Sequence, residues 1–380
     1  MRIYSYRKFL SKNFFIIVAN FLILLNGLIY PQTSYALTLG SGNCQSSYTQ
    51  TTGTFTVSDS FQSGNNCIVV FKTNSNTTTA TGTWTLPYLS VSITYLIVGG
   101  GGSGSRGTCG ITYGPGGGGG GVVSGTDTFT GTVNITVGKG GAAYSLGTCP
   151  NTSGNAGDSS TFHNLTASGG GAAGTGKTGG TSGNGNAGGT ASDSGCGECG
   201  AGGGGGAGGS GGGTPSQGGI SGMNAGAGVS SSISGSAVEY GSGGAGRSGN
   251  YFGVARGGGG STNNTGGSGS CNATSSTGGG GSDCGASGWG SGGSGVVILQ
   301  YTIDVTAPTY SSSAVASSGT SLTMTYSETL SATTAAASRF TISRSFTGLG
   351  TDTITISAVR SEEHTSELQS RQYLVCRLLL

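Results

Sequence analysis

Charged side chains and histidines are scarce in this chain, and each shortage excludes a class of function. Only 7% of the 380 residues are charged, and between residues 37 and 359 eight Lys or Arg stand against ten Asp or Glu, a net charge of −2. That segment has no basic stripe of the kind that binds nucleic acid. His163 is the only histidine before the last 21 residues, and we expect it to be a solvated or hydrogen-bonded strand residue. No convergent set of catalytic groups is visible, so we predict a protein that is not an enzyme and holds no cofactor or metal.

Long hydrophobic runs are also missing, with one exception near the start. Residues 1–13 are basic, residues 14–30 are apolar, and small residues stand at Ser34 and Ala36. This order is typical of a secretory signal peptide that is cleaved after Ala36. A retained membrane anchor is the alternative, because the run approaches spanning length, but two asparagines and a glycine interrupt it. We therefore predict a signal peptide over residues 1–36, a secreted or cell-surface protein, and membrane contact only through the export signal.

Glycine, in contrast, is abundant, and 75 of the 84 glycines lie between Gly99 and Gly295. Composition alone favours a disordered linker, because glycine loses more conformational freedom on folding than any other residue. Two β-like apolar runs, residues 91–98 and 296–301, bracket the glycines, and cysteines are spread among them. These features favour an ordered body between the two runs.

Export makes the cysteines informative, because disulfides persist in oxidising compartments. Eight cysteines precede the last 21 residues, and eight allow 105 connectivities, so the sequence does not fix the pairs. A zinc half-site or a redox dithiol is the alternative for Cys196 and Cys199. Zinc requires a second close pair and a thioredoxin-like motif requires a βαβ unit, and the chain offers neither. We expect disulfides between sequence neighbours: Cys44–Cys67, Cys109–Cys149, Cys196–Cys199 and Cys271–Cys284.

Short β-branched and aromatic runs surround the first glycines. Residues 54–57, 67–71 and 81–84 are such runs, split by Ser, Asn and Gly. Residues 132–137 alternate apolar and polar side chains, as a half-buried strand does, and with residues 122–129 they predict a hairpin. Residues 159–166 predict a weaker strand.

The order of several sequence motifs along the chain resembles that of a known family. Gly82-Thr-Trp-Thr-Leu-Pro87 is followed by Val98-Gly-Gly-Gly-Gly-Ser-Gly104, by Thr132-Val-Asn-Ile-Thr-Val-Gly-Lys-Gly-Gly141, and by a closing Gly293-Ser-Gly-Val-Val-Ile-Leu-Gln-Tyr301. Together they resemble the glycine-rich domain of bacterial and phage surface proteins, over about residues 67–301. Related folds in phage tail-fibre adhesins are bundles of polyglycine II helices with recognition loops at one end. The signal peptide and the cysteines depart from the tail-fibre pattern.

The physics of such a bundle agrees with the composition. Helices of the polyproline II type have three residues per turn and no internal hydrogen bonds, so their backbone groups are free to pair sideways. Close lateral packing leaves no room for a Cβ, and the glycine run 202–206 fits that requirement. We therefore predict a polyglycine II-type bundle.

Residues 171–178 match the P-loop pattern, Gly-Ala-Ala-Gly-Thr-Gly-Lys-Thr. A P-loop needs a strand before it and a helix after it, whose N-terminus receives the phosphate. Residues 179–185 read Gly-Gly-Thr-Ser-Gly-Asn-Gly, which does not support a helix. We predict no nucleotide binding.

The sequence changes in character at Asp304-Val-Thr-Ala-Pro308, where glycine becomes rare. Alternating runs at residues 322–326, 339–342 and 353–356 follow it, and the segment resembles the Ig-like repeats of bacterial surface proteins. The segment of residues 302–359 is shorter than a complete sandwich of about 100 residues, so the repeat would be truncated. Residues 360–380 resemble a translated sequencing adapter. We expect that tail to be an artefact that is unpacked or helical, in which Cys376 and His364 carry no meaning.

The fold prediction is all-β: short strands bracket a glycine-rich polyglycine II-type bundle over residues 37–301, and a truncated Ig-like β-sandwich follows. The expected function is adhesion or recognition, by loops on this rigid scaffold, of a cell-surface glycan or protein. Tyr251 and Phe252 are candidate contact surfaces and Arg247 and Arg256 candidate polar anchors, because these residue types are enriched at binding hot spots. The alternative for all four is a structural role, in which they cover the edge of the bundle and contact no ligand. The alternative function is a structural envelope or extracellular-matrix component with no specific ligand.

Overall fold

The structure, a computed structural model, describes most of the chain after the first 35 residues. The described residues fall into two compact units that divide between Ile303 and Asp304. None of them is helical, which confirms the predicted all-β class, and none forms a helix long and apolar enough to cross a membrane. The described ranges are residues 36–39, 46–62, 65–73, 78–105, 113–143, 153–174, 178–190, 200–212, 224–248, 251–262, 271–283, 288–302, 309–317, 321–327, 342–346, 350–363 and 372–379.

Nine described strands form the main sheet of the first unit, and every pairing is antiparallel. The order is β3-β4-β14-β5-β7-β8-β9, while β2 pairs with β5 and β1 with β2. The strands are β1 (Ala36–Leu39), β2 (Ser46–Thr52), β3 (Phe55–Gln62), β4 (Asn66–Thr73), β5 (Ala80–Val98), β7 (Val122–Val137), β8 (Ser160–Phe162), β9 (Leu165–Ala167) and β14 (Val296–Thr302).

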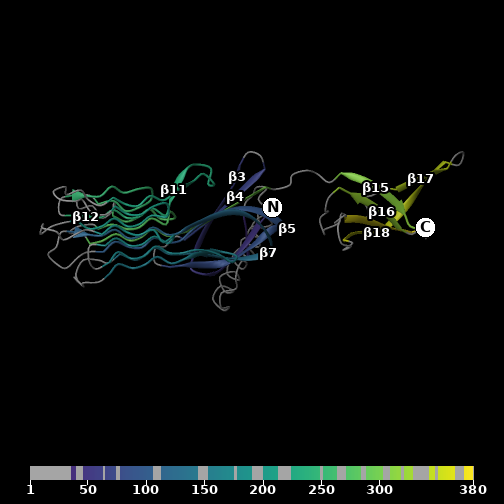
Figure 1. Ribbon diagram of the computed structural model, residues 1–380. Helices are drawn as coiled ribbons and strands as arrows, with labels where there is room; N and C mark the ends of the chain where they lie inside the picture. The colour runs from purple at the N-terminus through teal and green to yellow at the C-terminus, as the bar shows by residue number, and fades with distance from the viewer. Residues whose placement is uncertain are drawn as a thin grey trace, which may run out of the picture. The chain divides into compact units, whose positions relative to one another are not determined.

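The two runs that bracket the glycines are neighbours in this sheet. Val296 on β14 pairs with Val98 on β5, and the register continues to Tyr301 beside Ile93. The chain therefore leaves the sheet at the end of β5 and returns next to it at the start of β14. Between these points the chain adds β7, β8 and β9 to the same sheet, and the glycine-rich segments extend beyond the ends of the strands (Figure 1).

The hairpin predicted between residues 122–129 and 132–137 is wrong, because β7 is one continuous strand across both runs. Gly131 takes a positive φ of 71° within it without reversing the chain. The reason lies in β5, which is longer still and shifts register between Thr85 and Ser90, so that β7 pairs with it along both halves. The predicted strand at residues 159–166 is a small hairpin, β8 and β9.

One core fills the space that the sheet encloses. Trp84 is fully buried there, and its ring centroid lies 6.4 Å from Phe71, 6.4 Å from Phe162 and 5.8 Å from Tyr301. The alternating residues Val133, Ile135 and Val137 of β7 face the same core. Each large apolar side chain buried in this way contributes about 1.5–3 kcal/mol.

The other face of the central strands packs against a hairpin of the glycine-rich region. This hairpin is β10 (Val229–Ser231) with β11 (Val238–Tyr240), paired antiparallel. Tyr240 is buried against Ile68, Leu96 and Ile298 of the sheet, and the partly buried Val229, Ile233 and Val238 pack on the same cluster. The hairpin thus fixes the glycine-rich region to the sheet by ordinary apolar burial.

The remaining glycine-rich segments form a bundle that extends from the sheet (Figure 1). Residues 99–105 show its geometry, because every third backbone N–H donates to the same neighbouring segment. Gly99 and Gly102 donate to residues 121 and 118, Gly100 and Ser103 to residues 158 and 155, and Gly101 and Gly104 to residues 293 and 290, at 2.8–3.1 Å. A period of three residues per turn with only lateral hydrogen bonds is the polyglycine II arrangement.

The carbonyl oxygens of this segment point to yet other neighbours. Gly100 and Ser103 accept from Gly170 and Ala173, while Gly101 accepts from Gly141 and Gly102 from Gly281. Residues 99–105 are therefore surrounded on all sides by six bundle segments. Glycine is required at such positions by space: a Cβ on Gly100 would overlap the carbonyl oxygen of Lys139.

The second unit contains one five-stranded sheet in its described part, with the order β15-β16-β19-β18-β17. The expectation that residues 360–380 lie unpacked or helical is wrong, because β19 pairs with both β16 and β18. The run Tyr373-Leu-Val-Cys376 is rich in strand-forming residues and fits between two strands. The Ig-like resemblance stays a prediction. The strands are β15 (Tyr310–Val315), β16 (Ser321–Tyr326), β17 (Ile342–Phe346), β18 (Gly350–Glu363) and β19 (Gln372–Leu379).

Candidate functional site

The candidate site is the end of the bundle that lies farthest from the sheet. Residues 99–105 run away from β5, and residues 115–121 return antiparallel to β7, so the segments alternate in direction. We call the outer ends of the segments the distal end, which includes β6 (Tyr113–Gly114), β12 (Arg247–Ser248), β13 (Tyr251–Phe252), Asp283 and Trp289. In Figure 1, β12 marks this end, at the left of the bundle.

Three short strands and one bridge organise the distal end. β12 lies between β13 and β6, with Arg247 opposite both Phe252 and Gly114. Asp283 and Trp289 form an isolated antiparallel bridge. Here the polyglycine II pattern gives way to β pairing, and side chains larger than glycine become possible.

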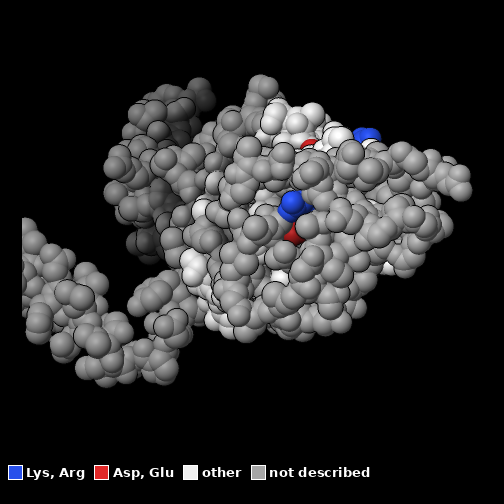
Figure 2. Space-filling model, turned by 90° about the vertical axis from the view of Figure 1, so that its left-hand side faces the viewer, with Lys and Arg blue, Asp and Glu red and all other residues white. Residues whose placement is uncertain are grey.

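An ion pair connects β12 to Asp283 at the distal end. The Nη1 atom of Arg247 is 4.0 Å from Oδ2 of Asp283, and the side chains are only 15% and 1% exposed. A carboxylate buried to that degree is stable only when it is paired or hydrogen-bonded. Gly114 makes room for it, because a Cβ on Gly114 would lie 2.7–2.8 Å from the Asp283 side chain. Figure 2, which faces this end, shows a basic and an acidic side chain side by side.

The structure brings three of the four predicted contact residues together and separates the fourth. Arg247, Tyr251 and Phe252 share the β12–β13 hairpin, although the side chains of the last two lie outside the described residues. Arg256 is exposed at a turn near the sheet, where its carbonyl accepts from Gly259 N at 2.8 Å and the adjacent Gly257 packs on Glu239 of β11. At about 3.1 Å per residue, Arg256 is about 12 Å from Phe252 along its segment. The contact roles stay predictions.

Sequence reasoning missed Asp283, the residue that holds Arg247. Asp283 lies 36 positions after Arg247 in a glycine-rich stretch, and no local pattern connects the two. Its identity as one of the few acids between Gly99 and Gly295 was the only available signal. Side chains on two segments can pair only where those segments are neighbours in the bundle. The glycine runs carry no information about which segments are neighbours.

Two other predictions fall partly on described residues. Cys67 and Cys271 are buried, at 0% and 2% exposure, while Cys44, Cys109, Cys149, Cys196, Cys199 and Cys284 lie outside the described residues, so the disulfide pairing stays a prediction. His163 is exposed at the turn between β8 and β9, and its ring contacts Phe129 edge-on at 5.8 Å.

The segment with the P-loop pattern is part of the bundle. Gly171 donates to the carbonyl of Thr181 at 2.7 Å and Gly174 to that of Thr178 at 3.1 Å, so two antiparallel segments flank residues 175–177. Residues 178–190 contain a turn at residues 183–184 and do not form the helix whose N-terminus a P-loop uses. Within the described ranges, no three His, Cys, Asp or Glu side chains are grouped as metal ligands would be.

Comparison with known proteins identifies the body of the chain. A family model described as a glycine-rich domain matches residues 74–302, from just before β5 to the end of β14, which is 229 of the 380 residues. No curated protein matches the chain. The match confirms the predicted glycine-rich domain, while the resemblances to phage adhesins and to Ig-like repeats stay predictions.

Proposed function

Since the chain belongs to the glycine-rich domain family, we propose that it is a secreted or cell-surface protein, not an enzyme, that recognises a partner through the distal end of its bundle. The partner class is a cell-surface glycan or protein. Export by a signal peptide at residues 1–36 and disulfides among the eight cysteines are parts of this proposal.

One observation carries it: the described segments on both sides of eight connections end together at the distal end. The segments flanking residues 106–112, 144–152, 175–177, 191–199, 213–223, 249–250, 263–270 and 284–287 all end there. The connections at the opposite end are strands of the sheet, the β10–β11 hairpin or short turns. A rigid scaffold that presents grouped connections at one end is the usual architecture of recognition proteins.

The distribution of charge supports the same end. Six of the eleven charged residues between Gly99 and Gly295 lie in these connections or directly beside them, three of each sign. The bundle interior consists of backbone and small side chains, so it offers no chemistry of its own. The six are Arg106, Lys177, Asp193, Glu198, Arg247 and Asp283.

A structural component of an envelope or extracellular matrix, with no specific ligand, is the second candidate. The regularity of the bundle favours it, because a rod held by lateral backbone hydrogen bonds is stable without a partner. The two candidates differ in what the distal residues do.

The test is binding of the mature protein, residues 37–380, to a glycan array and to whole cells. Recognition by the distal end predicts saturable binding that the double variant Tyr251→Ala/Phe252→Ala weakens at least about tenfold, as hot-spot truncation does. Tyr310→Ala is the matched control, since Tyr310 is an aromatic residue 57% exposed in the second unit, and we expect it to bind as the unchanged protein does. Absence of saturable binding, or equal loss in the control, would support the structural alternative.

A further inference from the structure

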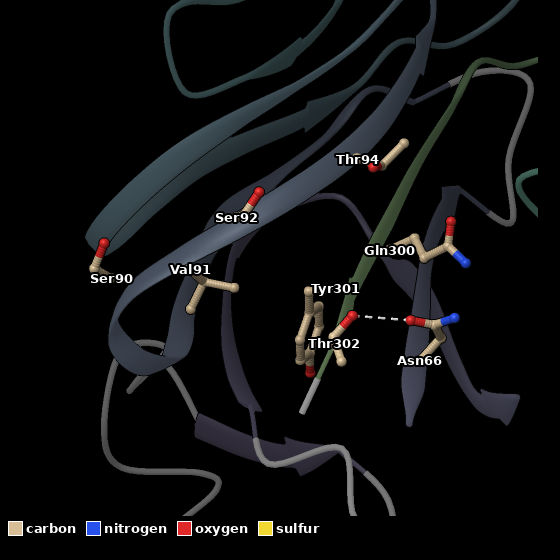
Figure 3. Close-up of a pocket in the computed structure, with 8 residues that line it drawn as sticks. All are labelled: Asn66, Ser90, Val91, Ser92, Thr94, Gln300, Tyr301 and Thr302. Carbon is tan, nitrogen blue, oxygen red and sulfur yellow. Dashed lines mark hydrogen bonds between the residues drawn. The ribbon is translucent and has the colours of Figure 1, made fainter. Parts of the chain in front are cut away.

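A second candidate site lies on the main sheet rather than on the bundle. It is a depression of about 350 Å³ over β4, β5 and β14, lined chiefly by Asn66, Ser90, Ser92, Thr94, Gln300 and Thr302 (Figure 3). This volume is within the range of about 300–1,000 Å³ that ligand pockets occupy.

The pocket is formed by one face of three adjacent strands. Gln300 on β14 pairs with Thr94 on β5, and Thr302 pairs with Asn66 on β4, so these side chains project from the same face. Tyr301, which alternates with them, turns into the core and is 1% exposed. In Figure 3, Gln300 and Asn66 lie together on one side of β14 and Tyr301 lies on the other.

This face changes character along the strands. Near the bundle it is apolar, with Leu96 and Ile298 buried beneath the β10–β11 hairpin. Two residues further from the bundle the same face carries Thr94 and Gln300, and beyond them Thr302. The strands therefore provide an apolar half for the hairpin and a polar half for water or a polar ligand.

Several hydrogen-bonding groups of the polar half are available. Thr302 Oγ1 donates to Asn66 Oδ1 at 3.0 Å, which orients the Asn66 amide and leaves its NH₂ group open. The side chains of Ser90, Ser92 and Gln300 form no hydrogen bond with the described part of the chain. Hydroxyl and amide groups both donate and accept, so together they offer both functions.

The lining carries no Lys, Arg, Asp or Glu, so it has no charge with which to select an ionic ligand. It also offers no backbone edge to an extended peptide, because β14 is paired on both sides, with β4 and β5. We propose that this pocket binds an uncharged saccharide unit, whose hydroxyl groups both donate and accept hydrogen bonds. Without an exposed aromatic ring in the lining, a single unit binds weakly, with a Kd of about 1 mM or higher.

The test is saturation-transfer NMR on the mature protein with the methyl β-glycosides of glucose, galactose and N-acetylglucosamine, each at several concentrations. We expect transfer from at least one of the three. Gln300→Ala weakens binding about fivefold, the effect of one or two lost hydrogen bonds, and Ser92→Phe abolishes it by filling the depression. Thr85→Ala is the control, because Thr85 is an exposed threonine on the other half of β5, and binding is unchanged.

Three results would overturn the proposal: no transfer from any glycoside, transfer that survives Ser92→Phe, or binding of a neutral Ser/Thr-rich peptide at these residues in place of the sugars. If Ser92→Phe does not fold by circular dichroism, Gln300→Asn replaces it, with a weakening of at least about twofold expected and an unchanged titration counting against the pocket. The Tyr251→Ala/Phe252→Ala variant should retain glycoside binding, so that failure of this site and failure of the distal end remain distinguishable.

Discussion

Replacing Gly117 by alanine tests the physical basis of the bundle. Gly117 donates to the carbonyl of Gly281 and accepts from the N–H of Gly244, both at 2.8 Å, so it is held between two segments. A Cβ on Gly117 would overlap the carbonyl oxygen of a third segment, at Gly102. Backbone surrounds the site, so no side chain is available to rotate away.

The expected cost follows from these contacts. Overpacking a rigid site costs about 1–3 kcal/mol, and each lateral hydrogen bond lost as the segments separate costs about 0.5–1.5 kcal/mol more. Alanine also lowers the conformational entropy of the unfolded chain, which raises the free energy of unfolding by about 0.4–1 kcal/mol. The net loss of unfolding free energy is about 2–4 kcal/mol, which lowers the Tm of a domain of this size by about 4–16 °C.

The assay is thermal unfolding followed by circular dichroism, with Gly209→Ala as the matched control. Gly209 belongs to the same bundle, has an ordinary φ, and would place a Cβ in open space. The control should change the unfolding free energy by no more than about 0.5–1 kcal/mol. Equal unfolding temperatures for Gly117→Ala and Gly209→Ala would refute the argument that absence of a Cβ holds the segments together.

Three further predictions concern other parts of the first unit. Arg247→Ala removes the cation that pairs with the buried carboxylate of Asp283, so we expect a loss of about 3 kcal/mol in chemical denaturation; the double variant Arg247→Ala/Asp283→Asn should recover part of it, and equal losses would argue against the pair. Alkylation followed by mass spectrometry should detect no free thiol among the eight cysteines of the exported protein, whereas stoichiometric zinc or modified Cys196 and Cys199 would contradict the disulfides. Limited proteolysis without reductant should leave residues 37–301 as one resistant fragment, and free cleavage throughout residues 169–295 would count against an ordered body.

The sequence was sufficient for the fold class and for the bundle because both depend on local rules. Alternation in residues 132–137 identified one face of β7, and glycine runs indicated segments that pack without a Cβ. The hairpin within β7 was predicted wrongly because a glycine between two β-like runs usually marks a turn. Only the length of β5, the partner strand, shows that β7 continues through Gly131. The expectation that residues 360–380 are unpacked or helical was wrong for a similar reason, since the pairing of β19 depends on β16 and β18.

The candidate site was predictable only in part. Arg247, Tyr251 and Phe252 stand out because larger side chains are rare among the glycines, and their position at one end follows from the alternating direction of the segments. Arg256 was grouped with them because it is near in sequence. A segment that rises about 3.1 Å per residue carries a residue four positions away to the other end, which reading by sequence proximity overlooks.

The same physics explains why sequence neighbours inform so little about spatial neighbours here. In a sheet or helix, side-chain patterns record what each residue packs against. In this bundle the contact between residues 99–105 and their six neighbouring segments is made by backbone groups, which are identical at every glycine. The interior is consequently intolerant of any added Cβ yet indifferent to what lies in the connections, so the connections at the distal end are free to change without cost to the body. A scaffold of this kind separates the residues that hold the fold from those that can take up a binding role, and this separation is the physical reason to look for recognition at the distal end.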